Sequence, residues 1–389
     1  MKRLALITTH PIQYNAPFYK LLTERGKVRL KVFYTWPQAI EGFDDPDFGT
    51  KVKWDIPLLE GYDWEAVNNV SKKPSSKKWG GIDCPNLIDK INAYQPDAVM
   101  VYGWNLKSHF HVMRHFKNHT PVWFFGDSTL LDEKPGWRKW IRRLWLTWVY
   151  RHIDRAFYVG SNNKAYFIAH GLKEEQLVFF PHAVDNERFF DNEERQYEKR
   201  AQQMRKELGF QENDNVILFA GKLEVKKDPL LLLAAVQQVN TTTDRSVKLL
   251  FVGNGPLESE LRARTVNNPY VKFLPFQNQS IMPVVYRLGN VFCLPSRGPG
   301  ETWGLAVNEA MACGRPVIVS NQVGCAVDLI MDNINGKIVY AGDRNSVISA
   351  IAEIEPVSLS QMGRQSAIHV IKWNYAKKAE AVENAIHDR

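Results

Sequence analysis

Short apolar runs alternate along this chain with stretches in which apolar and polar residues recur at the spacing of a helix. The first half is predicted to hold strands at residues 4–8, 28–34, 98–102, 122–125 and 156–159. Strands that alternate with helices form parallel βαβ units. The pattern therefore predicts a doubly wound α/β domain in the first half.

The second half repeats this pattern. Its predicted strands are residues 216–220, 247–252, 271–274, 291–294 and 316–319. Between the halves, residues 191–214 are rich in Glu, Arg, Gln and Asn, which suits a connector with one solvated helix. We place the domain boundary near residue 195, with ligand-binding loops expected after the carboxyl ends of the strands.

Composition fits this two-domain interpretation. The chain has 389 residues, of which 44% are hydrophobic and 24% charged, as in globular proteins. The apolar patch after Met1 is too short for a signal peptide, and runs such as 229–236 are too short to span a bilayer. Four cysteines without CxxC spacing argue against a zinc site or a disulfide framework and fit a reducing cytosol. The net charge of +8 favours acidic partners: nucleotide diphosphates, anionic lipid or nucleic acid.

The most informative segment is residues 296–318, SRGPGETWGLAVNEAMACGRPVI. A Gly- and Pro-rich loop leads into a predicted helix that begins near Gly304. The backbone amides of residues 302–305 would point out of its N-terminus, where they can bind a diphosphate. Glu301 lies in the loop beside them and can accept hydrogen bonds from sugar hydroxyls. Glu309 lies about a turn and a half inside the helix, where it either contacts ligand or is an ordinary helix-face residue.

A second cluster is FAGKLEVKKDP at residues 219–229. Here a strand ends and another helix begins, with Asp228 suited to its N-cap. Lysines such as Lys222 and Lys227 surround this helix end. They form either an electropositive pocket or a solvated run of charge.

Two further loops follow predicted strands. Residues 249–256, LLFVGNGP, fail as a dinucleotide fingerprint because Glu258 stands where Gly or Ala is needed. Gly253 is therefore either part of a plain turn or part of a ligand pocket. In the first half, the loop HPIQYNAP begins at His10 and includes Gln13, which either contact ligand or cap and pack the following helix.

The Glu-x7-Glu arrangement and the run EAMACGRPVI resemble the donor-site signature of retaining GT-B glycosyltransferases, of glycosyltransferase family 4 or group 1 type. The resemblance covers nearly the whole chain. It implies an α/β chain of the GT-B fold, with two doubly wound Rossmann-like domains facing across a cleft. Residues 1–195 would bind the acceptor and residues 196–370 the nucleotide-sugar donor. A C-terminal helix, 371–389, would return to the first domain.

The resemblance also implies roles for the donor-side residues. Glu301 would contact the transferred sugar and Glu309 the ribose, while Lys222 and Lys227 would bind the diphosphate and offset charge on the leaving group. Relatives often carry Arg where Lys222 stands, and Lys offers a point charge instead of a bidentate fork. Glu301, Lys222 and Lys227 are the catalytic candidates. The donor-binding candidates are Gly221, Gly253, Phe276, Thr302, Trp303, Gly304, Leu305 and Glu309.

On the acceptor side, the His-Pro-Ile-Gln-Tyr loop marks a subset of the family that we associate with bacterial surface-polysaccharide enzymes. His10 and Gln13 would contact acceptor or diphosphate. Many relatives carry a histidine after the strand 122–125, whereas Asp127 takes that place here, so the role of that histidine is not carried over. Residues 181–189 resemble the hinge segment of the family, with His-Ala in place of Asn-Gly.

The predicted function is thus retaining transfer of a sugar from a UDP- or GDP-sugar to a glycan or lipid-linked acceptor, in bacterial surface polysaccharide, lipopolysaccharide or glycoconjugate biosynthesis. No metal and no cofactor are predicted, since no DxD motif follows a strand and the acidic run 44–47 reads as a polar loop. The alternatives are a nucleotide-sugar epimerase or hydrolase of the same fold, or a basic nucleic-acid-binding protein. No nucleic acid partner is predicted, because no recognised binding motif is present.

A Trp-rich segment, residues 134–148, predicts an amphipathic helix. Its apolar stripe is Trp137, Trp140, Ile141, Leu144, Trp145 and Trp148. Its basic residues are Arg138, Lys139, Arg142 and Arg143. Either the stripe packs on the sheet, or the helix contacts an anionic membrane through Trp137, Trp140, Arg142, Arg143 and Trp145. The protein is accordingly expected in the cytoplasm, either free or at the inner face of the membrane.

Overall fold

The computed structural model describes residues 1–40, 43–45, 50–52, 54–244 and 246–388. By its internal contacts the chain divides into two compact units. The first comprises residues 1–43, 52–182 and 375–389, and the second comprises residues 44–51 and 183–374. The chain thus changes unit between His182 and Ala183, upstream of the boundary near residue 195 that the connector suggested, and the last helix belongs to the first unit.

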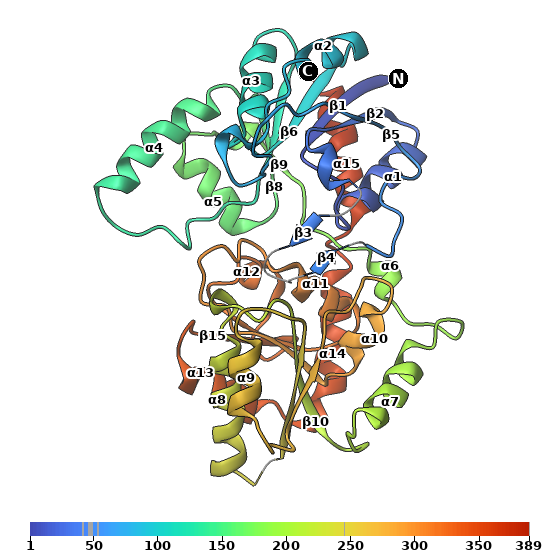
Figure 1. The fold of residues 1–389 in the computed structure, drawn as a ribbon, viewed down its shortest axis with the longest axis vertical. Helices are drawn as coiled ribbons and strands as arrows, with labels where there is room; N and C mark the ends of the chain where they lie inside the picture. The colour runs from blue at the N-terminus through green and yellow to red at the C-terminus, as the bar shows by residue number, and fades with distance from the viewer. Residues whose placement is uncertain (41–42, 46–49, 53, 245, 389) are drawn as a thin grey trace. The chain divides into compact units, whose positions relative to one another are not determined.

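The first unit is built on a parallel sheet in the order β5-β2-β1-β6-β7-β8-β9. Its strands are β1 Lys2–Thr8, β2 Val28–Tyr34, β5 Asp63–Ala66, β6 Ala98–Tyr102, β7 Val122–Phe125, β8 Arg155–Tyr158 and β9 Leu177–Phe179. Its helices are α1 Ala16–Glu24, α2 Leu87–Tyr94, α3 Lys107–Phe116, α4 Trp137–Tyr150, α5 Ser161–Ala169 and α15 Tyr375–His387, with short 3₁₀ turns η1 Pro37–Ala39, η2 Trp79–Gly81 and η3 Glu174–Gln176. Figure 1 shows α15 beside α1.

The second unit repeats the plan with a parallel sheet in the order β12-β11-β10-β13-β14-β15. Its strands are β10 Asn215–Ala220, β11 Val247–Val252, β12 Val271–Leu274, β13 Val291–Leu294, β14 Val317–Ser320 and β15 Gly336–Val339. Its helices are α6 Asn186–Phe189, α7 Tyr197–Glu207, α8 Pro229–Thr242, α9 Glu258–Arg264, α10 Met282–Arg287, α11 Leu305–Ala312, α12 Ala326–Leu329, α13 Arg344–Glu353 and α14 Pro356–Val370, with η4 Val225–Lys227. In Figure 1, α8 and α13 lie along one side of this sheet and α10 and α14 along the other.

Both sheets have a switch point, where the order of the strands along the sheet reverses. It lies between β1 and β6 in the first unit and between β10 and β13 in the second. The inner strands are buried apolar runs on both faces, such as Leu4–Ile7 and Phe292–Leu294, as parallel sheets covered by helices require. This confirms the prediction of two doubly wound α/β domains.

All the predicted strands are confirmed, with β8 lying one residue earlier in the chain than predicted and β14 one residue later. The acidic run 44–47, predicted as a polar loop, begins within a short strand, β3 Phe43–Asp45, which pairs with β4 Thr50–Val52. Asp47 of that run lies outside the described residues. All four cysteines are buried free thiols.

The last helix, α15, is fastened to α1 by charge and by aromatic rings. Glu383 pairs with the guanidinium of Arg25 at 2.6 and 2.8 Å. Lys378 is 1% exposed, and its ammonium lies 4.8 Å from the ring of Phe18 and 4.4 Å from that of Phe180. Burial lowers the pKa of Lys378 to about 7. The C-terminal helix is therefore an integral part of the first unit.

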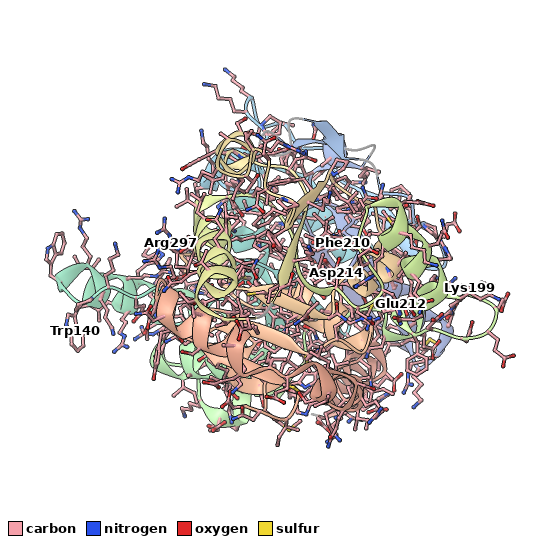
Figure 2. The ribbon with its side chains drawn as sticks, turned by 90° about the horizontal axis from the view of Figure 1, so that it is seen from below. Trp140, Lys199, Phe210, Glu212, Asp214 and Arg297 are labelled. Atoms are coloured by element: carbon pink, nitrogen blue, oxygen red, sulfur yellow. The ribbon has the colours of Figure 1, made fainter. Side chains whose placement is uncertain are left out.

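Helix α4 presents its aromatic stripe to solvent. Trp137, Trp140 and Leu144 are 68, 67 and 74% exposed, and only Leu146, Val149 and Tyr150 of this helix are buried. Figure 2 shows Trp140 pointing away from the ribbon. The alternative in which the stripe packs on the sheet is therefore wrong. Only the C-terminal part of α4 is buried against the rest of the first unit.

Candidate donor site in the second unit

The predicted donor residues lie in the loops on either side of the switch point in the second sheet. The loop after β10 carries Gly221 and Lys222 and leads through η4 to Lys227. The loop after β13 carries Glu301 and leads into α11. Ligands bind at this kind of edge in doubly wound sheets, where the loops diverge and leave room. The topology thus gathers residues that are far apart in sequence.

An ion pair joins the two loops. Lys227 Nζ lies 2.8 Å from Glu301 Oε2, and their side chains are only 15% and 9% exposed. Ser296, which follows β13, donates from Oγ to the same carboxylate oxygen at 3.2 Å. The cation expected to bind the diphosphate and the carboxylate expected to bind the sugar are therefore in contact with each other.

Helix α11 begins as the sequence predicted. Gly304 is its N-cap residue, with a φ of +94° that favours glycine. The first amide groups of a helix have no acceptor within it and point out of its N-terminus, so this end is suited to an anion. Thr302, Gly304 and Leu305 lie at this end, next to Glu301.

Trp303 has a different place from the one expected of a donor-binding side chain. Its ring is 3% exposed, donates from Nε1 to Asn308 Oδ1 at 2.8 Å, and packs against Trp373 with ring centroids 5.1 Å apart. The side chain is therefore committed to the interior of the second unit. Any contribution to ligand binding is limited to the backbone at this position.

Glu309 lies inside the unit, with 2% of its surface exposed. Tyr286, on α10, donates from its hydroxyl to Glu309 Oε2 at 2.6 Å. A ribose hydroxyl bound by this carboxylate would share it with Tyr286. Tyr286 could not be predicted as a partner of Glu309, because 23 residues separate the two and Tyr286 lies on another helix.

Gly253 is required by the close approach of two loops. A Cβ at this position would lie 2.3 Å from the carbonyl oxygen of Gly221, and its φ is +126°. The next residue, Asn254, accepts from the backbone amide of Phe276 at 2.7 Å and donates to Glu258 at 2.9 Å. The loops after β10, β11 and β12 are thus held to one another, and Asn254, like Tyr286, is a residue that sequence reasoning missed.

The acceptor-side candidates lie in the first unit, and each follows the carboxyl end of a strand. His10 follows β1 and contacts Thr9 Oγ1 through Nδ1 at 3.0 Å. Burial lowers the pKa of His10 to about 4, so its ring is neutral at pH 7. Gln13 lies half-buried in the turn before α1.

Asp127 follows β7 and has a histidine beside it. Nε2 of His182, which follows β9, lies 3.6 Å from Asp127 Oδ2. Burial lowers the pKa of His182, while Asp127 acts in the opposite direction. An imidazole therefore stands beside Asp127, although it comes from a segment 55 residues later in the chain. The His-Ala replacement at residue 182 was the only sequence signal for it.

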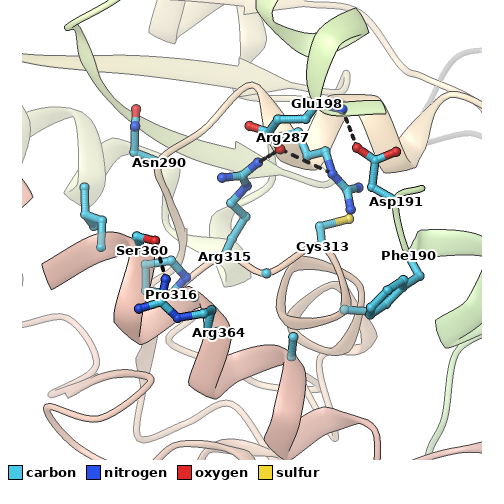
Figure 3. Close-up of a pocket in the computed structure, with 15 residues that line it drawn as sticks. Phe190, Asp191, Glu198, Arg287, Asn290, Cys313, Arg315, Pro316, Ser360 and Arg364 are labelled. Atoms are coloured by element: carbon cyan, nitrogen blue, oxygen red, sulfur yellow. Dashed lines mark hydrogen bonds and ion pairs between the residues drawn. The ribbon is translucent and has the colours of Figure 1, made fainter. Parts of the chain in front are cut away.

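A cavity of about 540 Å³ lies elsewhere in the second unit. Asn290 and Pro316, in its lining, precede β13 and β14, so it opens at the amino edge of the sheet, opposite Glu301. Figure 3 shows Arg287 and Arg315 in it. Since ligands of such folds bind at the carboxyl edge, we do not assign the donor to this cavity.

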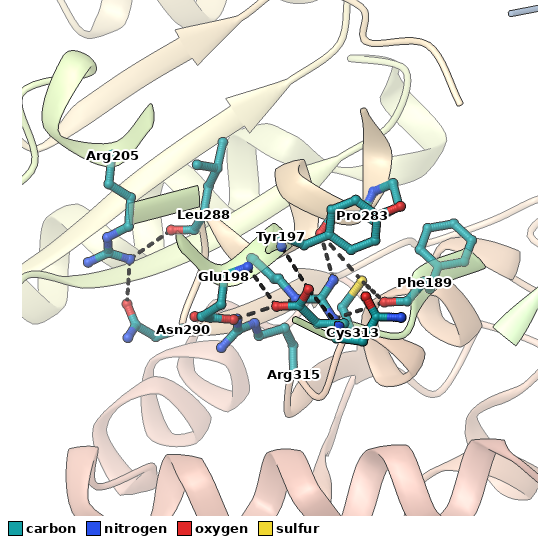
Figure 4. Close-up of polar contacts among 12 residues, drawn as sticks. Phe189, Tyr197, Glu198, Arg205, Pro283, Leu288, Asn290, Cys313 and Arg315 are labelled. Carbon is teal, nitrogen blue, oxygen red and sulfur yellow. Dashed lines mark hydrogen bonds and ion pairs between the residues drawn. The ribbon is translucent and has the colours of Figure 1, made fainter. Parts of the chain in front are cut away.

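The polar groups around this cavity hold α7 in place. Glu198 pairs with Arg315 at 2.5 Å and with Arg287 at 3.5 Å. Arg205 donates to the carbonyl oxygen of Leu288 at 2.8 Å and to Asn290 Oδ1 at 3.1 Å (Figure 4). The connector helix that the sequence predicted as solvated is thus bound to the second unit through its charged residues.

Among the residues that the structure describes, no group of three or more His, Cys, Asp or Glu side chains is placed to hold a metal ion. No helix in the described ranges has the length and apolar character needed to cross a membrane.

Sequence comparisons identify two domain families in this chain. Residues 200–361 match the family described as glycosyl transferases group 1, and residues 69–183 match a glycosyl transferase 4-like domain. A D-inositol 3-phosphate glycosyltransferase from Gordonia bronchialis is 30% identical over 194 residues. That match spans 46% of this chain and 41% of the length of the relative, so the chain covers less than half of it.

Structural comparisons cover almost the whole chain. HepE of Anabaena, in complex with UDP and glucose, has a TM-score of 0.70 and 16% identity, covering 99% of both chains. WaaG, a glycosyltransferase involved in lipopolysaccharide biosynthesis, has a TM-score of 0.68 and 14% identity, covering 99% of this chain and 100% of WaaG. The two parallel-sheet α/β units therefore have the GT-B fold.

Proposed function

We propose that this protein, a chain of the GT-B fold with group 1 glycosyl transferase sequence over residues 200–361, transfers a sugar from a nucleotide diphosphate to a glycan or lipid-linked acceptor. The observation that carries the proposal is the contact between Lys227 and Glu301 beside the N-terminus of α11. A cation, a carboxylate and helix-end amides at one switch point match the charges and hydroxyls of a sugar diphosphate.

In this proposal the leaving group is stabilised by positive charge from the protein. Lys222, Lys227 and the first amides of α11 offset the charge that develops on the departing phosphate, without a metal. Glu301 orients the sugar through its hydroxyl groups. The bond from the anomeric carbon to the phosphate oxygen breaks, and a bond to the acceptor oxygen forms on the same face, with retention of configuration. The acceptor proton passes to the donor phosphate oxygen, so no protein nucleophile is assigned.

The nucleoside would extend from the diphosphate toward the remaining loops. Glu309, held by Tyr286, is assigned to the ribose, and Gly253 and Phe276 to the neighbourhood of the base. The complex of HepE with UDP and glucose makes a UDP-sugar the first donor to test. A GDP-sugar is the second.

The acceptor is assigned to the carboxyl edge of the first sheet, where His10, Gln13, Asp127 and His182 lie. His182 joins the acceptor candidates because its ring contacts Asp127. The relatives suggest a role in lipopolysaccharide or another surface glycoconjugate, since WaaG acts in lipopolysaccharide biosynthesis.

Nucleotide binding to the purified chain tests the proposal. Thermal shift and calorimetry with UDP, GDP and ADP are expected to single out one nucleotide. Its binding should be lost in Lys227→Ala and retained in Lys226→Ala, a neighbouring lysine that pairs with Glu224 at 3.5 Å instead of Glu301. Binding of no nucleotide, or equal loss in both variants, would contradict the proposed donor site.

Turnover distinguishes transfer from the alternative reactions of the same fold. With the matching nucleotide sugar, nucleotide release is expected only when an acceptor preparation is added. Release of free sugar, or epimerisation of the donor without acceptor, would instead identify a hydrolase or an epimerase.

A further inference from the structure

The exposed stripe of α4 and the exposed ring of Trp79 both pack on Phe110, a ring that is itself buried at 4% exposure. The ring centroids of Trp145 and Trp148 lie 4.9 Å apart, and those of Trp148 and Phe110 lie 5.5 Å apart. Phe110 is in turn 5.6 Å from Trp79, which is 45% exposed. Two segments that lie nearly 60 residues apart in the chain thus share one aromatic surface.

The second segment brings its own positive charge. Immediately before Trp79 the chain reads SKKPSSKK, and its lysines, Lys72, Lys73, Lys77 and Lys78, are all exposed. On the neighbouring helix α3, the guanidinium of Arg114 lies 6.0 Å from the ring of Phe110. Neither residues 71–79 nor residues 134–151 contain Asp or Glu. We call the exposed aromatic and basic residues of these two segments the aromatic-basic surface.

Three basic residues of α4 bind other residues of the first unit, so that the tryptophan stripe faces solvent. Lys139 and Arg143 turn toward Glu133, with nitrogen to oxygen distances of 3.0 and 3.8 Å. Arg142 donates to the hydroxyl of Tyr166 on α5 at 3.3 Å. Arg142 and Arg143, which the sequence suggested as membrane contacts, therefore fasten the helix to its own unit. The side chains exposed to a partner are the tryptophans, Ile141, Leu144 and the cations Arg138 and Arg142.

We propose that the aromatic-basic surface docks the first unit onto a membrane that contains anionic lipid. Tryptophan is favoured at the level of lipid headgroups, and an apolar stripe flanked by Lys and Arg is the composition of an interfacial helix. An exposed apolar patch of this kind marks an interaction site. The helix lies in the interface and does not cross the bilayer, because its 14 residues are about 21 Å long.

The positive charge of this surface favours anionic lipid as its partner over a second copy of the chain. A symmetric dimer through this surface would bring the same cations of both copies together, with no acidic residue in either segment to offset them. A layer of anionic headgroups supplies the opposite charge over the whole surface. The proposal goes beyond the transfer reaction and does not depend on it.

Vesicle flotation of the full chain tests the proposal. Binding is expected to phosphatidylcholine vesicles that contain phosphatidylglycerol, and much less to phosphatidylcholine alone. The variant Trp137→Ser/Trp140→Ser/Leu144→Ser should bind the anionic vesicles at least about tenfold more weakly. The variant Lys72→Ser/Lys73→Ser/Lys77→Ser/Lys78→Ser should lose the preference for anionic lipid and the sensitivity to salt.

Three other exposed apolar side chains provide the matched control. Val266, Tyr340 and Val357 of the second unit are 71, 69 and 87% exposed, and replacing all three by Ser should leave vesicle binding unchanged. Circular dichroism and thermal melting should show all variants folded, since every substituted side chain is exposed. Equal binding by the control and the tryptophan variant would overturn the proposal. So would a wild-type dimer in sedimentation that the tryptophan variant converts to monomer.

Discussion

Lys227 Nζ and Glu301 Oε2 lie 2.8 Å apart across the switch point of the second sheet, in a setting where neither side chain is more than 15% exposed. Lys227, proposed to bind the phosphate, and Glu301, proposed to bind the sugar, therefore neutralise each other's charge. Each one fixes the position of the other before it meets a donor.

The first prediction follows from this pair. Lys227→Ala should lower the free energy of unfolding by about 2–4 kcal/mol, because a nearly buried carboxylate loses its counter-charge. Lys227→Ala/Glu301→Ala should recover part of this loss, giving a coupling energy of about 1–3 kcal/mol in a double-mutant cycle measured by denaturant unfolding. Additive effects of the two single changes would show that the pair contributes no mutual stabilisation.

The second prediction concerns the hydroxyl of Tyr286. Tyr286→Phe should cost about 1.5–3 kcal/mol of stability, because Glu309 loses a short hydrogen bond in a buried site. Tyr340→Phe, at a residue that is 69% exposed, serves as the control and should have no effect. If Glu309 binds ribose, the wild type should prefer UDP to 2′-deoxy-UDP, and Glu309→Ala should abolish that preference. A preference that survives Glu309→Ala would place the ribose elsewhere.

The third prediction tests the contact between the loops after β10 and β11. Gly253→Ala should lower stability by more than about 2 kcal/mol, since its Cβ would clash with the backbone of Gly221. Gly342 has a φ of +76° and nothing within 4 Å of an added Cβ. Gly342→Ala should therefore cost only about 1 kcal/mol, the price of the backbone conformation alone. Equal losses in thermal unfolding would show that the close approach does not matter.

The fourth prediction concerns the pH dependence that Lys378 brings. Its pKa is lowered in the folded state to about 7, so between that pH and its ordinary pKa near 10.5 the unfolded chain binds more protons. Stability should therefore rise with pH through this window, as the cost of burying the charge disappears. The rings of Phe18, Phe125, Phe180 and Tyr375 face the ammonium, and they oppose part of that cost.

The variant Lys378→Met isolates this effect. It should raise the stability at pH 7 and flatten the dependence between pH 7 and 10 in denaturant unfolding, because no buried charge remains to be neutralised. Lys377→Met, at the exposed neighbouring position, should keep the wild-type slope. A slope that persists in Lys378→Met must come from other groups that titrate between pH 7 and 10; His182 is not among them, because burial lowers its pKa below this window.

The fifth prediction uses kinetics to distinguish a residue of the acceptor side from the residues of the donor site. His182→Gln should lower kcat by about tenfold or more once an acceptor is found, while the affinity for the nucleotide stays unchanged. His119 is exposed and lies before β7, at the opposite edge of the same sheet from Asp127. His119→Gln should therefore leave both constants unchanged. A loss of nucleotide affinity in His182→Gln would remove the residue from the acceptor side.

Most inner strands could be predicted because they are apolar runs buried on both faces, and β2, VRLKVFY, because it is rich in β-branched and aromatic residues. Of the four edge strands described in the two parallel sheets, only β12 was predicted. β5 reads DWEA and has no apolar run, whereas β9 is apolar, LVF, but only three residues long and partly exposed. β15, at the edge of the other sheet, is mostly buried but reads GKIV, in which Gly and Lys interrupt the apolar pattern.

The loops of the candidate site could be predicted because a doubly wound order places them at the carboxyl ends of strands. Their contacts could not, since Lys227 and Glu301 are 74 residues apart and only the fold joins them. For α4, the periodicity identified a stripe of apolar residues. It could not tell whether that stripe faces inward or outward, because either orientation satisfies the same pattern.

Because α15 belongs to the first unit but follows the second unit in the chain, part of the first unit is synthesised after the second. The ribosome makes residues 1–182, then the continuous segment of the second unit, and only then the helix that carries Lys378 and Glu383. Until that helix emerges, Arg25 and Phe18 on the nascent first unit lack these partners. The segment 183–374 can therefore complete its fold before the first unit does, so maturation of the two units runs opposite to their order along the chain.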